Sequence, residues 1–283
     1  MVFGVSAWSY HATDLDLFQM AEEAKKVGFD AFEVLDLPCE ESEALDYSAR
    51  FREHCDKLGI TILSAAISAD FLNGCDGDFE REVARLCRKV DVAEALGAKL
   101  MRHDAAWRAP DKNPELTFDD VLPTLAAGCR AVTEYAAEKG IRTMTENHGR
   151  FAQGSERMIR LVKAVDHPNY GILIDMGNVT GIDEHPLSAV KAMLPYAFHV
   201  HCKDFFILPG TADPGAGYNL TEHGNYTRPT IVGHGNVDVK ACIKAVKESG
   251  YQGAMMLEFE GMEEPLEAVR IGHDNMRRYW EEA

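Results

Sequence analysis

Residues 198–204 read Phe-His-Val-His-Cys-Lys-Asp, so that polar and apolar side chains alternate along the segment. Because successive side chains of a strand point to opposite faces, His199, His201 and Lys203 share one face. Two imidazoles and an ammonium make neither an apolar core nor an ordinary solvent-facing edge. We therefore expect this strand to end at a pocket, although single histidines are also common as satisfied core or surface groups.

Outward from this strand, the chain repeats a short apolar run followed by an amphipathic stretch. The predicted strands are residues 2–7, 30–35, 60–68, 98–103, 141–146, 170–175, 197–203 and 253–258. The predicted helices are residues 14–27, 47–58, 78–96, 117–139, 155–165, 186–193, 237–249 and 265–280. Strands that alternate with helices indicate right-handed βαβ units and parallel pairing. Eight such units predict an α/β fold, a closed (β/α)₈ TIM barrel formed as a single domain over residues 1–283.

One connection is much longer than loops of this fold usually are. Residues 204–236, which separate the seventh strand from its helix, form a long loop rich in Gly, Tyr, Asn and Pro. We expect either a functional lid or an ordered excursion that packs over the mouth of the barrel.

Composition narrows the class of protein. Hydrophobic content of 46% and charged content of 27% are typical of soluble globular chains. No apolar run is long enough to cross a bilayer and no signal peptide is recognisable, so we expect a cytoplasmic protein without membrane contact. Seven scattered cysteines favour reduced thiols over disulfides or a thiolate zinc site. A net charge of -17 opposes nucleic-acid binding and favours a small-molecule partner.

Glu146, Asp175, His201 and Glu258 stand at or near the ends of the last four predicted strands. Barrel active sites lie at the carboxyl ends of the strands, so these side chains should project toward one half of the mouth. Three neighbouring carboxylates cannot all stay ionised without a cation. Oxygen ligands with one imidazole suit Mn²⁺, Mg²⁺ or Co²⁺ better than a structural zinc site. The alternative is that each acid caps a helix or accepts loop amides, which would not require the histidine.

Four strand-end motifs resemble those of the xylose-isomerase-like TIM-barrel superfamily. They are TENHG at residues 145–149, DMGN at 175–178, HVHCKD at 199–204 and LEFE at 257–260. Within the superfamily, the chain is most similar to the sugar phosphate isomerase/epimerase group, which includes ketose 3-epimerases, hydroxypyruvate isomerases and inosose dehydratases. The resemblance covers the whole chain in order and spacing; its motifs are specific for the superfamily and weak for the substrate.

The resemblance implies that Glu146, Asp175, His201 and Glu258 bind one divalent metal, with Mn²⁺ favoured and Mg²⁺, Co²⁺ or Zn²⁺ as alternatives. It also implies that Glu146 and Glu258 are the catalytic acid/base pair. A metal that chelates a carbonyl and its neighbouring hydroxyl stabilises an enediolate, and one carboxylate then removes a proton that the other returns. We expect an isomerase or epimerase of a keto sugar or related hydroxy-carbonyl compound in carbohydrate metabolism. The alternative is a lyase or dehydratase that continues by β-elimination, like inosose dehydratases or enzymes that cleave 3-keto-glycosides.

Six further residues are candidates for substrate binding: His148, Asn178, Lys203, Arg102, Trp8 and Arg228. Many ketose epimerases have a histidine where this chain has Asn178, and an amide cannot relay a proton, which favours elimination. Lys203 either pairs with the substrate or forms a salt bridge to Asp204 or Glu260. His148 either contacts substrate, acts as a base, or is a loop histidine without a catalytic role.

Two other function classes fit the sequence less well. Phosphodiester cleavage, known from the related apurinic endonucleases, needs more strand-end histidines than this chain has, and the acidic charge opposes DNA. A binding barrel without catalysis would not need the intact set of metal ligands. We expect a homo-oligomer, either a dimer or a tetramer, because the exposed faces of such barrels often pair.

Overall fold

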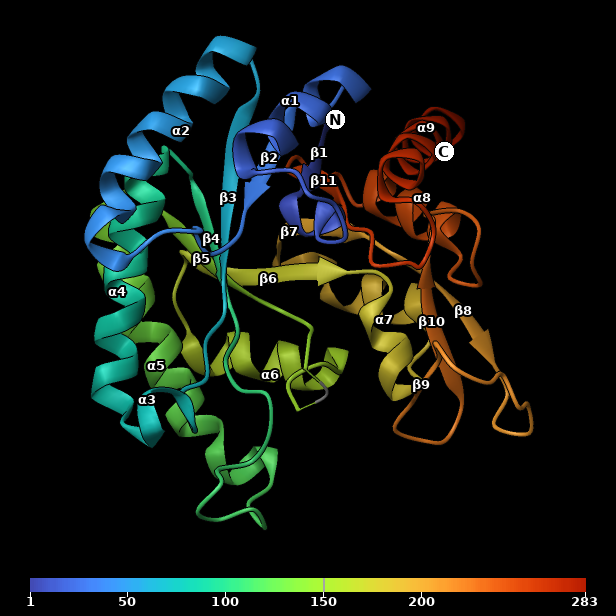
Figure 1. Ribbon diagram of the computed structural model, residues 1–283. Coiled ribbons are helices and arrows are strands. Elements are labelled where there is room, and N and C mark those ends of the chain that lie inside the picture. The colour runs from blue at the N-terminus through green and yellow to red at the C-terminus, as the bar shows by residue number, and fades with distance from the viewer. Residues whose placement is uncertain (150) are drawn as a thin grey trace. The chain divides into compact units, whose positions relative to one another are not determined.

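The strands of the barrel follow the predicted alternation with helices. The computed structural model describes residues 1–149 and 151–283. Eight strands form a closed barrel in the order β1-β11-β7-β6-β5-β4-β3-β2 (Figure 1). Their bounds are β1 Val2–Ser6, β2 Ala31–Val34, β3 Thr61–Ile67, β4 Leu100–His103, β5 Arg142–Glu146, β6 Tyr170–Asp175, β7 Ala197–Cys202 and β11 Ala254–Leu257. The predicted (β/α)₈ fold class is thereby confirmed.

Residue contacts group the chain into two compact units. The terminal unit comprises Met1–Phe32 and Ile174–Ala283, and the central unit comprises Glu33–Leu173. Each unit has its own strand pairs, helices and buried core. The single domain over residues 1–283 stays a prediction.

In the terminal unit, β11 pairs in parallel with β1 on one side and β7 on the other, and Met256 lies opposite His201. Its α-helices are α1 Leu17–Val27, α7 Pro186–Met193, α8 Val239–Glu248 and α9 Pro265–Glu282. Three 3₁₀ segments accompany them, η1 Ala7–Tyr10, η3 Asn178–Ile182 and η4 Leu194–Tyr196. Helix α1 begins where Asp16 and Gln19 form a reciprocal capping box, and it ends at Gly28 in the left-handed region.

In the central unit, β4 pairs in parallel with β3 and β5, and β5 pairs with β6. Its helical segments are η2 Glu41–Glu43, α2 Ala44–Leu58, α3 Gly74–Gly77, α4 Phe79–Leu96, α5 Phe118–Glu138 and α6 Ser155–Val165. Figure 1 shows α2, α4 and α5 side by side, in contact along the unit. Asp78 caps α4 through the N–H of Arg81, and Gly97 ends it at φ 78°.

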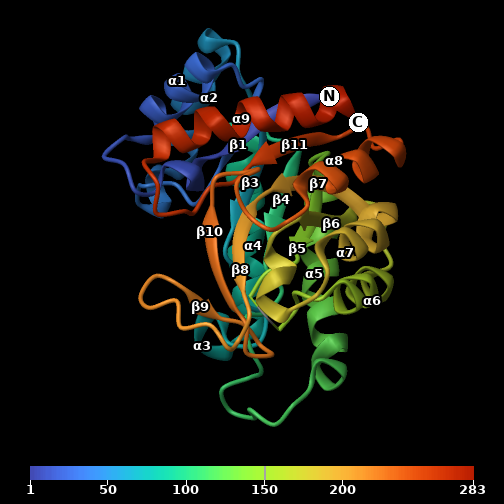
Figure 2. The ribbon, with the colours of Figure 1, turned by 90° about the vertical axis from the view of Figure 1, so that its right-hand side faces the viewer.

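The expected long loop over residues 204–236 is wrong as a description of secondary structure. Within the segment, β8 (Asp204–Leu208), β9 (Asn219–Leu220) and β10 (Tyr226–Thr230) form an antiparallel sheet in the order β8-β10-β9 (Figure 2). Pro229 lies inside β10, where a proline weakens any sequence signal for a strand. The segment is therefore ordered and contains a small sheet, whereas its role as a lid stays a prediction. We call residues 205–232 the excursion.

Several element ends differ from the prediction by up to three residues, among them the starts of α2 and β4. Helix α2 begins at Ala44 rather than at residue 47, since Ala44 and Leu45 continue the helix toward η2. Strand β4 begins at Leu100, two residues later than predicted. In the part of the chain that the structure describes, no helix combines the length and the apolar character that a membrane span requires.

Candidate active site

Asp175, His201 and Glu258 converge in the terminal unit, each from the end of a different strand. Asp175 ends β6, His201 lies in β7, and Glu258 directly follows β11. One ligand atom from each lies within 4.8 Å of the others, and all three side chains are buried. The Nδ1 atom of His201 is 3.5 Å from Glu258 Oε2. We call these three residues the acidic triad.

Backbone groups at the ends of the strands fix the triad. The Oδ1 atom of Asp175 accepts hydrogen bonds from the N–H groups of Gly177 at 2.8 Å and Asn178 at 2.7 Å. The N–H of Met176 donates to the carbonyl of His201, and the N–H of Glu258 donates to the carbonyl of Cys202, both at 3.1 Å. The loop after β6 thus orients the Asp175 carboxylate, and backbone hydrogen bonds hold the main chain of His201 and Glu258 in place.

Lys203 lies beside the triad and is almost completely buried. Its Nζ atom is 3.0 Å from Glu258 Oε2 and 2.9 Å from Glu260 Oε2. Burial opposes ionisation of Glu258, but the Lys203 ammonium and the His201 ring hold the pKa of Glu258 well below its usual range. Glu260 was one of the two salt-bridge partners predicted for Lys203. The other was Asp204, whose carboxylate accepts backbone N–H groups instead.

The predicted alternation along β7 is confirmed. His199, His201 and Lys203 are all buried, and the rings of His199 and His201 meet edge-on with centroids 5.3 Å apart. This contact requires both rings to project from the same face of the strand. The polar face of β7 therefore lines the interior and not a solvent-exposed edge.

Glu146 occupies a different electrostatic setting in the central unit. It ends β5, and its Oε2 atom is 2.6 Å from Nη2 of Arg102 in β4. The same Nη2 atom is 2.9 Å from Oδ1 of Asp104. One buried guanidinium thus joins two carboxylates at the ends of neighbouring strands.

His148 lies at the edge of this group and is the more accessible member. Its Nδ1 atom is 3.2 Å from Arg102 Nη2 and 3.5 Å from Asp104 Oδ1, and its side chain is 31% exposed. Trp107 packs against the ring at 4.5 Å, edge to face. Burial disfavours the charged imidazole, but the carboxylates of Asp104 and Glu146 raise the pKa of His148 above its ordinary value. We call Arg102, Asp104, Glu146 and His148 the basic cluster, because it brings together a guanidinium and an imidazole.

Three remaining substrate-binding candidates lie in the terminal unit. Asn178 is buried and begins η3. Trp8 is 41% exposed and stacks on His11, with ring centroids 4.9 Å apart. Arg228 lies in β10, and its guanidinium carbon is 5.0 Å from the ring centroid of Phe206 and 5.4 Å from that of Tyr218. The binding roles of Trp8, Asn178 and Arg228 stay predictions.

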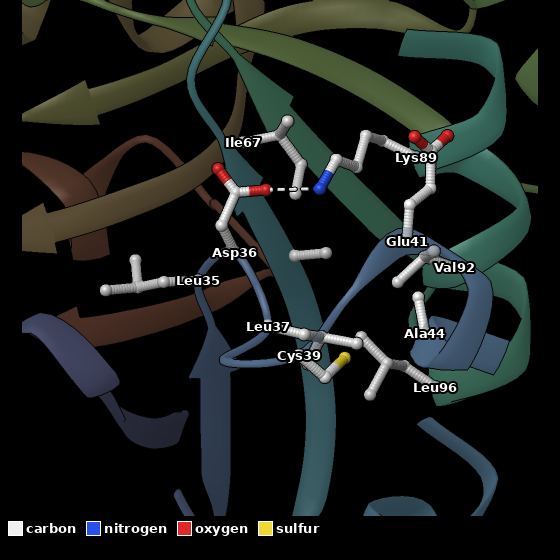
Figure 3. A pocket seen from close by; sticks show the side chains of 11 residues that line it. Leu35, Asp36, Leu37, Cys39, Glu41, Ala44, Ile67, Lys89, Val92 and Leu96 are labelled. Carbon is white, nitrogen blue, oxygen red and sulfur yellow. Dashed lines mark hydrogen bonds and ion pairs between the residues drawn. The ribbon is translucent and has the colours of Figure 1, made fainter. Parts of the chain in front are cut away.

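A small cavity of about 70 Å³ lies elsewhere in the central unit, between the end of β2 and helix α4 (Figure 3). Aliphatic side chains line most of it, and an ion pair between Lys89 and Asp36 at 2.7 Å crosses it. Substrate pockets usually measure some hundreds of Å³, on the order of 300 Å³ or more. This cavity contains none of the predicted site residues and is too small for a sugar.

The acidic triad has the donor set of a divalent-cation site. Two carboxylates and one imidazole, gathered in a buried place, suit a hard or borderline cation, and no thiolate lies among these ligands. The predicted metal is consistent with this donor chemistry. The identity of the metal stays a prediction, and so does the role of Glu146 as a fourth ligand.

A family model described as xylose isomerase-like TIM barrel matches residues 21–279. The chain belongs to this family. The resemblance that the four strand-end motifs indicated is therefore confirmed.

Two curated relatives of this xylose isomerase-like chain are dehydratases. A 3-dehydroshikimate dehydratase of Pseudomonas putida KT2440 is 26% identical over 243 residues, which are 84% of this chain but only 35% of that protein. The chain thus spans about a third of the length of that relative. An inosose dehydratase of Yersinia enterocolitica is 26% identical over 216 residues, 71% of this chain and 70% of that protein.

Among solved structures, D-psicose 3-epimerase with D-tagatose from Clostridium cellulolyticum H10 superposes with a TM-score of 0.76. It is 16% identical and covers 99% of both chains. At this identity the likeness establishes the shared fold and not a shared activity. The predicted homo-oligomer and cytoplasmic location stay predictions.

Sequence reasoning missed one member of the basic cluster. Asp104 is buried, contacts Arg102 and His148, and has a lowered pKa, since these two side chains outweigh the effect of burial. Its signal was available, because it directly follows the fourth predicted strand. It was overlooked because the predicted strand ended at His103, whose ring is buried against Phe71 and Tyr170.

Proposed function

We propose that this member of the xylose isomerase-like family is a divalent-metal-dependent dehydratase of a small keto polyol or related hydroxy-carbonyl compound. It would remove a proton next to the carbonyl and expel the β-hydroxyl as water. The observation that carries the proposal is the ammonium of Lys203 at 3.0 Å from Glu258. An epimerase needs a proton acceptor and a proton donor on opposite faces of the substrate, and this ion pair makes Glu258 a poor partner for either role.

In a closed barrel the carboxyl ends of parallel strands meet at one edge, which supports placing Glu146 beside the acidic triad. Asp175, His201, Glu258 and Glu146 would then hold one ion, with Mn²⁺ favoured and Mg²⁺, Co²⁺ or Zn²⁺ as alternatives. The ion, when bound, would supply the positive charge that makes the carbon next to the carbonyl acidic.

His148 is the residue that we assign to proton transfer. Asp104 and Arg102 orient its ring, and the ring retains access to solvent. His148 would take the α-proton from carbon and deliver it to the departing β-hydroxyl, so that one proton and one hydroxide leave together as water. This scheme needs a single base, whereas epimerisation needs two groups that both exchange protons.

The remaining predicted contacts would hold the hydroxyl groups of the substrate. Asn178 can donate and accept hydrogen bonds without relaying a proton. Arg228 offers a fork of donors, and Trp8 offers an exposed aromatic face. These roles are consistent with a hydroxylated ring of modest size, the kind of compound named for the inosose dehydratase relative.

The second candidate function is the isomerase or epimerase. It is favoured by the presence of both glutamates, Glu146 and Glu258, that serve as the acid/base pair in similar epimerases. The ion pair of each glutamate with a buried cation, Arg102 or Lys203, weighs against it. Apart from the proton-transfer groups, the same metal ligands and substrate-binding residues would serve dehydration and epimerisation.

One assay separates the two functions. The Mn²⁺-loaded protein is incubated in D₂O with inososes, 3-dehydroshikimate and ketoses, and the products are followed by NMR and mass spectrometry. The proposal predicts a product that has lost one water. An epimer that carries deuterium at carbon, with no loss of water, would establish the epimerase instead.

A further inference from the structure

Two aspartates, one buried and one partly buried, bind the excursion to the rest of the terminal unit, one at its base and one at its tip. Asp204 lies at its base, directly after Lys203, and Asp183 lies at its tip. We propose that Asp204 and Asp183 are positioning residues, which hold the excursion as a fixed wall of the substrate site and not as a mobile lid. The role in substrate binding rests on the proposed function, but the fastening itself does not.

At the base, the fully buried carboxylate of Asp204 accepts four backbone hydrogen bonds. Its Oδ1 atom accepts from Phe205 at 2.8 Å and from Val237 at 3.1 Å. Its Oδ2 atom accepts from Gly233 and Gly235, both at 2.9 Å. Residues on both sides of the excursion thus bind to one side chain, which closes the excursion at its stem.

The glycines of this segment are required by the close approach of the backbone. A Cβ atom on Gly235 would lie 2.3 Å from Asp204 Oδ1 and 2.5 Å from the carbonyl oxygen of Phe205. Gly233 has a φ of +94°, where other residues are strained. The backbone of the two glycines thus surrounds a carboxylate of the same chain.

At the tip, Asp183 binds the turn between β9 and β10. Its Oδ2 atom accepts from the N–H of His223 at 2.9 Å, and its Oδ1 atom accepts from Nδ2 of Asn225 at 2.7 Å. The N–H of Glu222 donates to the carbonyl of Gly181 at 3.0 Å. The tip is therefore bound to the end of η3, the segment that begins at Asn178, three residues after Asp175.

A third contact fixes the side of the excursion to the loop after β11. The Oγ1 atom of Thr230 donates to Glu263 Oε1 at 2.7 Å, and Nη1 of Arg228 lies 3.8 Å from the sulfur of Met262. The excursion is thus tied to the loops that follow Asp175 and Glu258 and to the end of the strand that carries His201. Arg228 is held in place by these ties together with Phe206 and Tyr218.

The test compares Asp204→Asn and Asp183→Asn with Asp213→Asn, a matched change at an exposed position of the same excursion. Asparagine keeps one carbonyl oxygen and replaces the second acceptor by an N–H₂ group, which faces backbone donors at Asp204. Asp183 has a φ of +60°, which asparagine tolerates, so that its variant keeps the backbone. Limited digestion with proteinase K, mapped by mass spectrometry, reports cleavage within residues 209–225, and circular dichroism reports global unfolding.

We expect digestion within the excursion to accelerate about tenfold in Asp204→Asn and by a smaller factor in Asp183→Asn, because charged hydrogen bonds are lost. With a turned-over substrate, we expect KM to rise about tenfold and kcat to change less, since the wall binds substrate without taking part in the chemistry. The Asp213→Asn variant should match the wild type in both measurements.

Equal digestion rates for all three variants would overturn the inference. If Asp204→Asn does not fold, Gly235→Ala tests the same hydrogen bonds by changing one of the residues that donate to Asp204. Asp183→Asn tests the contacts at the tip of the excursion. If no compound in the panel is turned over by the wild type, the proposed function fails, while the digestion rates still judge the fastening. Faster digestion with unchanged KM would overturn the role in substrate binding alone.

Discussion

The acidic triad and the basic cluster contain the same residue types in different arrangements. In the triad, two carboxylates and an imidazole lie within 4.8 Å of one another, and the ammonium of Lys203 contacts Glu258. In the basic cluster, Arg102 contacts both Glu146 and Asp104, and the histidine keeps contact with solvent. The first arrangement concentrates negative charge, which suits a cation. The second balances its charges around a histidine, which suits proton transfer.

The largest effect is expected from Asp175→Asn in the acidic triad. The amide keeps an oxygen for the N–H groups of Gly177 and Asn178 but removes a negative charge from the ligand set. We expect Mn²⁺ affinity to fall about a hundredfold and activity by about a thousandfold or more. Calorimetric titration with Mn²⁺ and a rate assay measure the two effects.

Asp166→Asn is the matched control for Asp175→Asn, since Asp166 is exposed and has a φ of 47°, which asparagine accepts. It should bind Mn²⁺ like the wild type. If Asp175→Asn also binds Mn²⁺ normally, the triad is not the cation site.

In the basic cluster, His148→Asn should separate chemistry from metal binding. We expect kcat to fall about a hundredfold or more, because general acid/base catalysis is lost, while Mn²⁺ affinity stays the same. His185→Asn, at the exposed N-cap of α7, serves as the control and should leave both unchanged. A large loss of metal affinity in His148→Asn would contradict the assignment of cation binding to the acidic triad and of proton transfer to His148.

Lys203→Met tests whether the ammonium decides between elimination and epimerisation. Without it, Glu258 becomes able to exchange protons, so we expect dehydration to slow about tenfold and deuterium exchange without loss of water to appear. Product analysis in D₂O measures both. Lys244→Met changes an exposed lysine of α8 and should behave as the wild type. Unchanged dehydration in Lys203→Met would show that the ion pair has no such influence.

Glu82 is a buried carboxylate outside both the acidic triad and the basic cluster. It pairs with Arg85 at 2.7 Å and accepts a hydrogen bond from the N–H of Asp70 at 3.0 Å. Burial raises its pKa, but these partners and the Cys75 thiol together lower it below the usual 4.5. Its ionised form therefore stabilises the fold fully above about pH 4.5, and this contribution is lost as the pH falls through the lower pKa of the folded state.

We expect Glu82→Gln to lower the free energy of unfolding by about 1–3 kcal/mol at pH 7, with little effect on kcat. The difference from the wild type should shrink as the pH falls below 4.5. Urea denaturation at several pH values measures it, and Glu80→Gln, at an exposed position of α4, is the control. A difference that persists unchanged in acid would contradict the role of the charge.

Much of the fold could be predicted because apolar residues are spaced differently in strands and in helices, and the two spacings alternate along the chain. The strand-end acids were also predictable, since a barrel gathers the ends of its strands at one edge. The sheet within the excursion was not, because its register joins residues that are far apart and contain Pro229. The four backbone hydrogen bonds to the Asp204 carboxylate were not predictable either, because every residue except proline has a backbone N–H group and the sequence does not show which ones meet a carboxylate. Asp104 directly follows a predicted strand, but its contacts with Arg102 and His148 arise only in the folded chain and could not be predicted.

Glu146 of the central unit and the acidic triad of the terminal unit are proposed to bind one cation together. A crystal structure of the Mn²⁺-loaded protein, with anomalous diffraction measured at the manganese edge, tests this proposed site. We expect one anomalous peak with ligand atoms from Glu146, Asp175, His201 and Glu258 around it. A peak that lacks Glu146, or one that lies away from the triad, would refute the proposed site.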